Sequence, residues 1–160
     1  MTVRGYVLAL IIFSLFLGFN QANAGTSDPA DTVSGYFEAS RNGDVDTMKT
    51  LIAGTFYDSQ KVLLTKNKAY PEFLKKYYQG VRIAIVSSSI GDIDMVAKDY
   101  PNLYKRYQRR EGDTTAAGNN DIAVVTVSRQ FTDGKTSNTD FLLKKDQQGN
   151  WKIYERLLGQ

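Results

Sequence analysis

The sequence contains no cysteine and no histidine. Without cysteine the chain cannot form disulfides, so core packing alone must hold the fold together. The absence of both residue types removes the usual ligands of zinc, copper and haem, and every nucleophilic arrangement built on a thiol or an imidazole. We therefore expect no metal site and no cofactor. Any chemistry has to come from carboxylates, tyrosines, basic groups and shape.

The longest apolar run lies at the N-terminus. Arg4 supplies a positive charge, residues 6–19 are almost wholly apolar, and Ala22-Asn23-Ala24 places small residues where signal peptidase reads them. The run has about 14 residues, fewer than the roughly 20 that a membrane-spanning helix needs, so an uncut anchor is the weaker interpretation. Residues 1–24 therefore predict a signal peptide cleaved after Ala24 and a periplasmic or secreted protein.

Cleavage sets the size and charge of the mature protein. It leaves 136 of the 160 residues, which suits a single domain over residues 25–160. It also removes Arg4 from the 20 Lys and Arg, leaving 19 of them against 17 Asp and Glu and a net charge of +2. This nearly even balance indicates neither a nucleic acid nor an acidic substrate as partner.

Capping residues and apolar spacing predict helices in the first half of the domain. Asp28 precedes Pro29, a pair typical of a helix start, and Asn42-Gly43 is typical of a helix end. The segment 56–65 fits either a helical turn or a short strand, and both alternatives stay open. The predicted helices run from Pro29 to Asn42, from Asp44 to Gly54 and from Tyr70 to Gly80.

β-Branched and apolar residues predict strands in the second half. The first strand covers residues 81–88, and three more form an antiparallel meander over residues 122–132, 135–145 and 151–158. Residues 92–121, which we call the insertion, separate the first strand from the meander. A helix is expected within it, because helical spacing relates Tyr100, Leu103, Tyr104 and Tyr107. Together these elements predict an α+β fold, with N-terminal helices packed on an antiparallel sheet.

The turn between the first two strands of the meander sets which side chains share a face. Asp133-Gly134 is a strong signal for a two-residue hairpin turn. Such a turn places Thr132 opposite Lys135 and Val127 opposite Asp140. A shift of one residue would move every side chain of a strand to the other face, so the prediction depends on this turn length.

On that register three charged residues become neighbours on one face of the sheet. Arg129, Asp140 and Glu155 would lie together among Val, Leu, Ile and Trp side chains. A charged cluster in an apolar wall can shift the pKa of a carboxyl group or orient a polar ligand. The plainer interpretation is a cross-strand ion pair near the rim of the sheet.

Several short strings and the order of the elements resemble a known family. The strings are Tyr36-Phe37 in the first helix, the link Asn42-Gly43-Asp44, the helix Phe73-Leu74-Lys75-Lys76-Tyr77-Tyr78, and the final Gly149-Asn150-Trp151-Lys152-Ile153. Over residues 28–158 the chain resembles the nuclear-transport-factor-2-like superfamily, which implies a cystatin-like cone with a curved antiparallel sheet wrapped over the helices. The superfamily includes ketosteroid-isomerase-like and polyketide-cyclase-like enzymes, non-catalytic ligand binders, dimerising modules and exported domains.

The leading functional hypothesis is an exported, non-enzymatic binding domain. A pocket between sheet and helices would hold a small apolar molecule or dock an envelope protein. The sequence does not decide whether the domain forms a homodimer. Tyrosines suit such a pocket because each combines an aromatic body with a hydroxyl. The candidate lining residues are Tyr36, Tyr57, Tyr77, Arg129, Asp140 and Glu155.

The first alternative is an acid–base enzyme of the isomerase or cyclase type. It needs a carboxylate in an apolar cone as general base and a tyrosine that stabilises the developing negative charge. Asp140 or Glu155 would be the base, with Tyr36 or Tyr154 as its partner. Tyr154 suits the role poorly, because its position in the strand predicts that it faces away from both acids.

The second alternative uses the insertion as an envelope adaptor. We call Tyr100, Leu103, Tyr104 and Tyr107 the tyrosine stripe. A basic face on the other side of the same helix could meet an anionic membrane surface or a secretion partner. That face is formed by Lys105, Arg106, Arg109 and Arg110. The plainer interpretation is that the stripe packs on its own domain and the cations are solvated.

Overall fold

The computed structural model describes residues 28–111 and 121–159. The predicted signal peptide lies outside these residues, as does the part of the insertion from 112 to 120, so cleavage after Ala24 stays a prediction. The elements, in chain order, are α1 (Pro29–Asn42), α2 (Val45–Leu51), α3 (Gly54–Lys66), α4 (Tyr70–Tyr78), β1 (Arg82–Gly91), α5 (Ile93–Asp99), α6 (Pro101–Glu111), β2 (Ile122–Gln130), β3 (Thr136–Lys145) and β4 (Trp151–Leu158).

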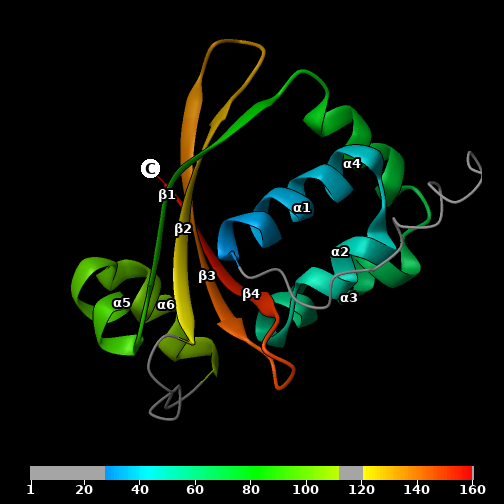
Figure 1. The fold of residues 1–160 in the computed structure, drawn as a ribbon. Coiled ribbons are helices and arrows are strands. Elements are labelled where there is room, and N and C mark those ends of the chain that lie inside the picture. Colours follow the sequence, from blue (N-terminus) through cyan, green and yellow to red (C-terminus); the bar gives the residue numbers. More distant parts are fainter. Residues whose placement is uncertain (1–27, 112–120, 160) are drawn as a thin grey trace, which may run out of the picture.

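The described elements form three layers with one sheet in the middle. Helices α1–α4 cover one face of the sheet and helices α5 and α6 cover the other (Figure 1). The sheet has the order β1-β2-β3-β4, and every neighbouring pair is antiparallel. The predicted α+β fold is therefore confirmed, and a second helical layer adds to it.

The predicted boundaries of the first helix are correct, and local hydrogen bonds explain them. The side chain of Asp28 accepts a hydrogen bond from the Ala30 N–H at 2.8 Å, which caps the N-terminus of α1. At the other end Gly43 has a φ of 64°, which glycine adopts without strain. A Cβ on Gly43 would approach the carbonyl oxygen of Pro71 to 2.8 Å, so glycine also allows α1 and α4 to pack closely.

The segment left open between helix and strand is helical. Residues 54–66 form α3, which buries Phe56, Gln60 and Leu64 at helical spacing. Val62 is 63% exposed, whereas Leu63 lies on the same side of the helix as Phe56 and Gln60 and is 39% exposed, so consecutive apolar residues lie on two sides of α3. The apolar run 62–64 therefore follows no clear helical pattern, which is why the sequence did not decide between helix and strand.

The tyrosine stripe of the insertion packs on its own domain. Leu103 and Tyr107 of α6 are fully buried against β2 and β3, and Tyr100 and Tyr104 pack at the edge of the same cluster. This confirms the plainer of the two interpretations for the stripe. None of the described helices is long and apolar enough to cross a membrane.

The β2–β3 turn has three residues, and the predicted register was wrong by one position. The N–H of Phe131 donates to the carbonyl oxygen of Lys135, and the N–H of Gly134 donates to that of Phe131. Gly134 has a φ of 82°, which suits the left-handed position of a three-residue hairpin loop. Thr126 rather than Val127 therefore lies opposite Asp140. The strand β3 is turned over relative to the prediction, and Asp140 lies on the opposite face from Arg129.

A bulge in β4 changes the face of Glu155. The register between β3 and β4 shifts after Ile153, so that Glu155 lies opposite Leu142 and Arg156 lies opposite Phe141. Leu142 belongs to the core under α5 and α6, whereas Phe141 belongs to the core under α1–α4. The predicted cluster of Arg129, Asp140 and Glu155 on one face does not form.

Candidate functional site

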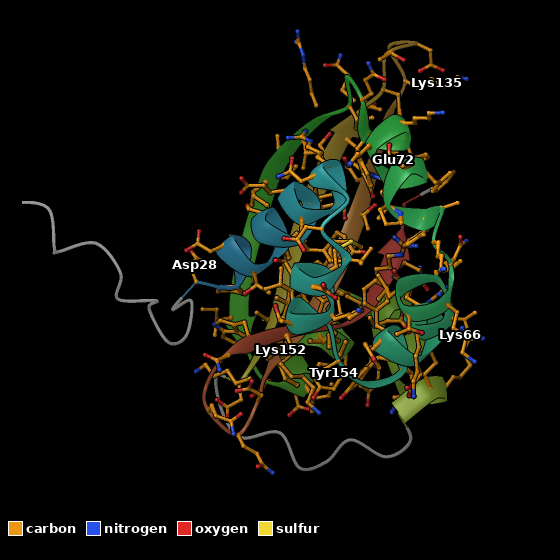
Figure 2. The ribbon with its side chains drawn as sticks, turned by 90° about the vertical axis from the view of Figure 1, so that its right-hand side faces the viewer. Asp28, Lys66, Glu72, Lys135, Lys152 and Tyr154 are labelled. Carbon is orange, nitrogen blue, oxygen red and sulfur yellow. The ribbon has the colours of Figure 1, made fainter. Side chains whose placement is uncertain are left out.

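A cavity of about 470 Å³ lies between the α1–α4 layer and the sheet, and it reaches the edge of β4. Part of that edge is covered, because the Ala53 N–H between α2 and α3 donates to the carbonyl oxygen of Ile153 at 2.9 Å. Beyond this bridge the lining includes residues of β4, namely Glu155, Arg156 and Leu158. Figure 2 looks onto the helical layer, with Lys66 marking the end of α3 and Glu72 marking α4.

Aromatic rings from α4 form one wall of the cavity. Tyr70, Phe73 and Tyr77 line it and stack on one another, with ring centroids 6.1 and 5.9 Å apart. Their i, i+3, i+7 spacing brings them onto one side of the helix. Phe73 is 57% exposed, although large apolar side chains are mostly buried. The cavity therefore has an apolar rim that is open to solvent.

Two buried tyrosines, Tyr36 and Tyr78, also line the cavity. Tyr36 of α1 is buried, and its hydroxyl lies 3.5 Å from Oε1 of Gln60. Burial raises the pKa of Tyr36, although the charge of Arg156 and the contact with Gln60 oppose this change. Burial also raises the pKa of Tyr78. Both side chains are therefore neutral phenols at neutral pH, with O–H groups that can donate hydrogen bonds.

Arg129 places a buried positive charge at the cavity. It extends from β2 and is 7% exposed. Its Nη2 atom donates to Oγ of Ser137 at 3.3 Å, and its guanidinium carbon lies 5.6 Å from the ring centroid of Phe131. Its buried Nε atom has no hydrogen-bond partner, and no acidic side chain among residues 28–111 and 121–159 forms an ion pair with it.

Glu155 is a buried charge with several partners. Arg106 Nε lies 3.0 Å from its Oε1, and Arg110 Nη1 lies 3.2 Å from its Oε2. Its Oε1 also accepts a hydrogen bond from the Arg156 N–H at 2.9 Å. The two arginine side chains are 38% and 35% exposed, whereas the carboxylate side chain is 1% exposed. The α6 arginines therefore shield this carboxylate from solvent and neutralise it.

Arg156 adds another positive charge on the α1–α4 side of the sheet. Its guanidinium carbon lies 5.5 Å from the ring centroid of Phe56, in a cation–π arrangement. Its positive charge acts on both Tyr36 and Tyr78, as the charge of Arg129 acts on Tyr78. The two guanidinium groups and the tyrosine hydroxyls therefore share one electrostatic environment.

The structure brings only some of the predicted residues to this cavity. Four of the six candidates line it, namely Tyr36, Tyr77, Arg129 and Glu155. Tyr57 packs beside the core without lining the cavity. Asp140 lies on the other face of the sheet, where its Oδ1 accepts a hydrogen bond from Thr126 Oγ1 at 2.7 Å.

The four basic residues of α6 divide into two pairs. Arg106 and Arg110 turn toward Glu155 and line the cavity, whereas Lys105 and Arg109 are exposed on another side of α6. All four were expected on one basic face, which would meet a membrane surface or a partner or would be solvated. The helical spacing of Arg106 and Arg110, on the side of α6 that also carries Leu103, was the signal that could have separated them.

Sequence reasoning missed some of the lining residues. Arg156 was not named because β4 was expected to alternate regularly, which would have directed Arg156 away from the cavity. Tyr70, Phe73 and Tyr78 were assigned to a helix without a role at the cavity. The i, i+3, i+7 spacing of Tyr70, Phe73 and Tyr77 was the visible signal for the aromatic wall.

The chemistry available in the cavity is cationic, aromatic and phenolic. Glu155 is the one carboxylate among the described lining residues, and each of its oxygens lies within 3.2 Å of an arginine of α6. No group of three acidic residues that could hold a metal ion occurs in the described parts of the chain.

Comparison with known proteins gives a fold neighbour and no family. No protein-family model and no curated protein matches the chain. Among solved structures, the chain is similar to a protein of unknown function with a cystatin-like fold from Methylobium petroleophilum PM1. The two share 10% sequence identity at a TM-score of 0.43, and the alignment covers 82% of this chain and 76% of that one.

Proposed function

We propose that this chain is an exported, non-enzymatic member of the nuclear-transport-factor-2-like superfamily that binds a small molecule with an apolar body. The observation that carries the proposal is the cavity of about 470 Å³ beside the aromatic wall of α4. Its volume falls within the roughly 300–1,000 Å³ of small-molecule pockets, which are mostly lined by apolar and aromatic side chains. The order of elements and the short strings in the sequence support the superfamily.

The positions and partners of Asp140 and Glu155 support a binding function over acid–base catalysis. The enzymatic alternative required Asp140 or Glu155 as a general base inside the cone. Asp140 lies outside the cavity, and Glu155 is engaged by Arg106 and Arg110. A bound molecule would therefore meet hydrogen-bond donors and aromatic faces before it met an available base.

Native mass spectrometry of the protein purified from its own source tests the proposal. The expected spectrum shows a retained small molecule at one copy per chain. The same measurement reports whether the protein is a homodimer and whether its N-terminus is the one left by cleavage after Ala24. The substitution Ser59→Phe fills the cavity from α3 and should abolish retention. The matched control is Thr65→Phe, an exposed position on the same helix that does not line the cavity.

Two results would contradict the proposal. One is a wild-type spectrum with the mass of the polypeptide alone, together with no binding of small aromatic probes at millimolar concentration. The other is equal retention by Ser59→Phe and the wild type, which would put the bound molecule elsewhere.

A further inference from the structure

The distribution of charge around the cavity narrows the class of ligand, given the binding function proposed above. Four arginines and one carboxylate line the cavity, namely Arg106, Arg110, Arg129, Arg156 and Glu155. The carboxylate is ion-paired with Arg106 and Arg110. No described acidic side chain forms an ion pair with Arg129 or Arg156. The cavity therefore carries an excess of positive charge on the α1–α4 side.

Arg129 is the strongest of these signals. A buried charge is costly unless it is paired and hydrogen-bonded. Arg129 is 7% exposed, yet its contacts are one 3.3 Å hydrogen bond to Ser137 and the face of Phe131, and its Nε–H has no acceptor among the described residues. A planar guanidinium of this kind matches a carboxylate in geometry as well as charge.

We propose that the cavity binds an organic anion, in which one carboxylate is attached to an apolar body and Arg129 recognises the carboxylate. Arg156 supplies a second positive charge. Tyr78 also lines the cavity, and its neutral hydroxyl is a further hydrogen-bond donor.

The rest of the cavity suits the apolar body of such a ligand. The stacked rings of Tyr70, Phe73 and Tyr77 form the exposed rim, whereas Arg129 is buried. A molecule with a charged head and an apolar body fits this order, with its carboxylate inside and its body against the rings. The body can be a fused aromatic ring or an alkyl chain, and the test below separates the two.

Isothermal titration calorimetry on the processed protein tests this inference with three probes. They are 2-naphthoate, its neutral analogue 2-naphthamide, and decanoate. We expect 2-naphthoate to bind wild-type protein on the order of tenfold or more tightly than 2-naphthamide, because a hydrogen bond to a charged group is stronger than one to a neutral group. Tighter binding of decanoate than of 2-naphthoate would assign the body to an alkyl chain, and the reverse order to an aromatic ring.

Substitutions then assign the carboxylate to Arg129. Arg129→Gln should weaken the binding of 2-naphthoate by about tenfold or more and leave that of 2-naphthamide nearly unchanged. Arg129→Lys keeps the charge and should retain part of the discrimination. The matched control is Arg109→Gln, which removes an exposed cation of α6 that does not line the cavity. If Arg129→Gln unfolds, Arg156→Gln provides the same comparison with a smaller expected loss.

The outcomes separate this inference from the proposed function. Equal affinity of wild-type protein for 2-naphthoate and 2-naphthamide would overturn the inference and keep the binding function. Unchanged affinity for 2-naphthoate in both Arg129→Gln and Arg156→Gln would also overturn it. Failure of every probe to bind, together with a native spectrum that shows the polypeptide alone, would overturn both.

Discussion

Among the described residues, each face of the sheet buries one charged side chain, and the two side chains differ in their partners. On the α5–α6 face, Glu155 has an ion pair with Arg106 and another with Arg110, at 3.0 and 3.2 Å. On the α1–α4 face, Arg129 has a hydrogen bond to Ser137 at 3.3 Å and no acidic partner among the described residues. The first charge has two ion-pair partners within the fold, although its Oε2 atom accepts no hydrogen bond from the described residues. The second has no oppositely charged partner among those residues, and its Nε–H has no acceptor there.

On the proposed function, this difference separates a charge that the fold pairs from a charge that a ligand would pair. A buried ion pair is weak evidence for added stability, but breaking it leaves an uncompensated charge and is costly. A buried charge without a partner reduces stability in the free protein and becomes favourable when a ligand of opposite charge binds. On this reasoning substitutions on the two faces should change stability in opposite directions.

The largest expected effect comes from removing both partners of Glu155. The double substitution Arg106→Gln/Arg110→Gln leaves the carboxylate buried with the Arg156 N–H as its remaining donor. The free energy of unfolding, measured by urea denaturation, should fall by about 3–5 kcal/mol.

The matched control for that double variant is on the same helix. Lys105→Gln/Arg109→Gln removes the same charge from exposed positions of α6 and should change the free energy of unfolding by about 0.5 kcal/mol or less. Equal losses in the two double variants would mean that helix composition, rather than the pairing of Glu155, causes the effect.

Tyr36 and Tyr78, both buried on the α1–α4 face, should make the free energy of unfolding fall at alkaline pH. Burial raises the pKa of Tyr78 and of Tyr36 above the unfolded value of 10.0. The contribution of these neutral tyrosines to the free energy of unfolding is fully present below pH 10. It is lost as the pH rises toward the folded pKa, because in that range the unfolded chain releases the phenolic protons and the folded chain keeps them. Between the two pKa values each tyrosine should lower the free energy of unfolding by about 1.4 kcal/mol per pH unit.

Comparison of Tyr78→Phe with wild-type protein isolates this effect. Denaturation curves at pH 9, 10 and 11 should show a shallower decline in the variant, because phenylalanine cannot ionise. Parallel declines in the two proteins would show that Tyr78 ionises equally in the folded and unfolded states.

The smallest expected effect has the opposite sign to the first. Arg129→Met replaces the buried guanidinium by an apolar side chain of similar length. The free energy of unfolding of the free protein should rise by about 1 kcal/mol, because the cost of burying an unpaired charge exceeds the loss of the Ser137 and Phe131 contacts. Binding of 2-naphthoate should weaken in the same variant. A fall of about 2 kcal/mol or more would make Arg129 a structural residue and remove the contrast between the faces.

Local signals in the sequence were sufficient for most helices and strands. Asp28 and Gly43 set the ends of α1 through hydrogen bonds with near neighbours, which a sequence pattern can represent. Helix α3 was left open because its apolar run 62–64 includes the exposed Val62, which blurs the helical spacing of the buried residues. The face of β3 was wrong because Asp133-Gly134 suits both a two-residue and a three-residue turn, and tertiary packing decides between them.

The candidate site was less predictable than the fold, because it depends on long-range contacts. Tyr36, Tyr77, Arg129 and Glu155 were named, and the structure brings them to one cavity. Their expected relation was wrong, since Glu155 pairs with the insertion and not with Arg129. A contact between side chains 49 positions apart, such as that of Arg106 with Glu155, leaves no periodic trace in the sequence.

The bulge in β4 decides which charged side chain of that strand lies on the α1–α4 face of the sheet. In a strictly alternating strand, Trp151 and Ile153 would be followed on the α1–α4 face by Glu155, and Arg156 would point the other way. The bulge shifts the phase of the strand, so Arg156 lies opposite Phe141 on that face and Glu155 turns to the insertion. Two adjacent residues of opposite charge thus exchange sides without any change in side chain. Backbone phase therefore places Arg156 on the α1–α4 face, whereas Glu155 lines the cavity in ion pairs with Arg106 and Arg110. A chain with the same Glu-Arg pair on a regular strand would place the carboxylate on the α1–α4 face, apart from those arginines.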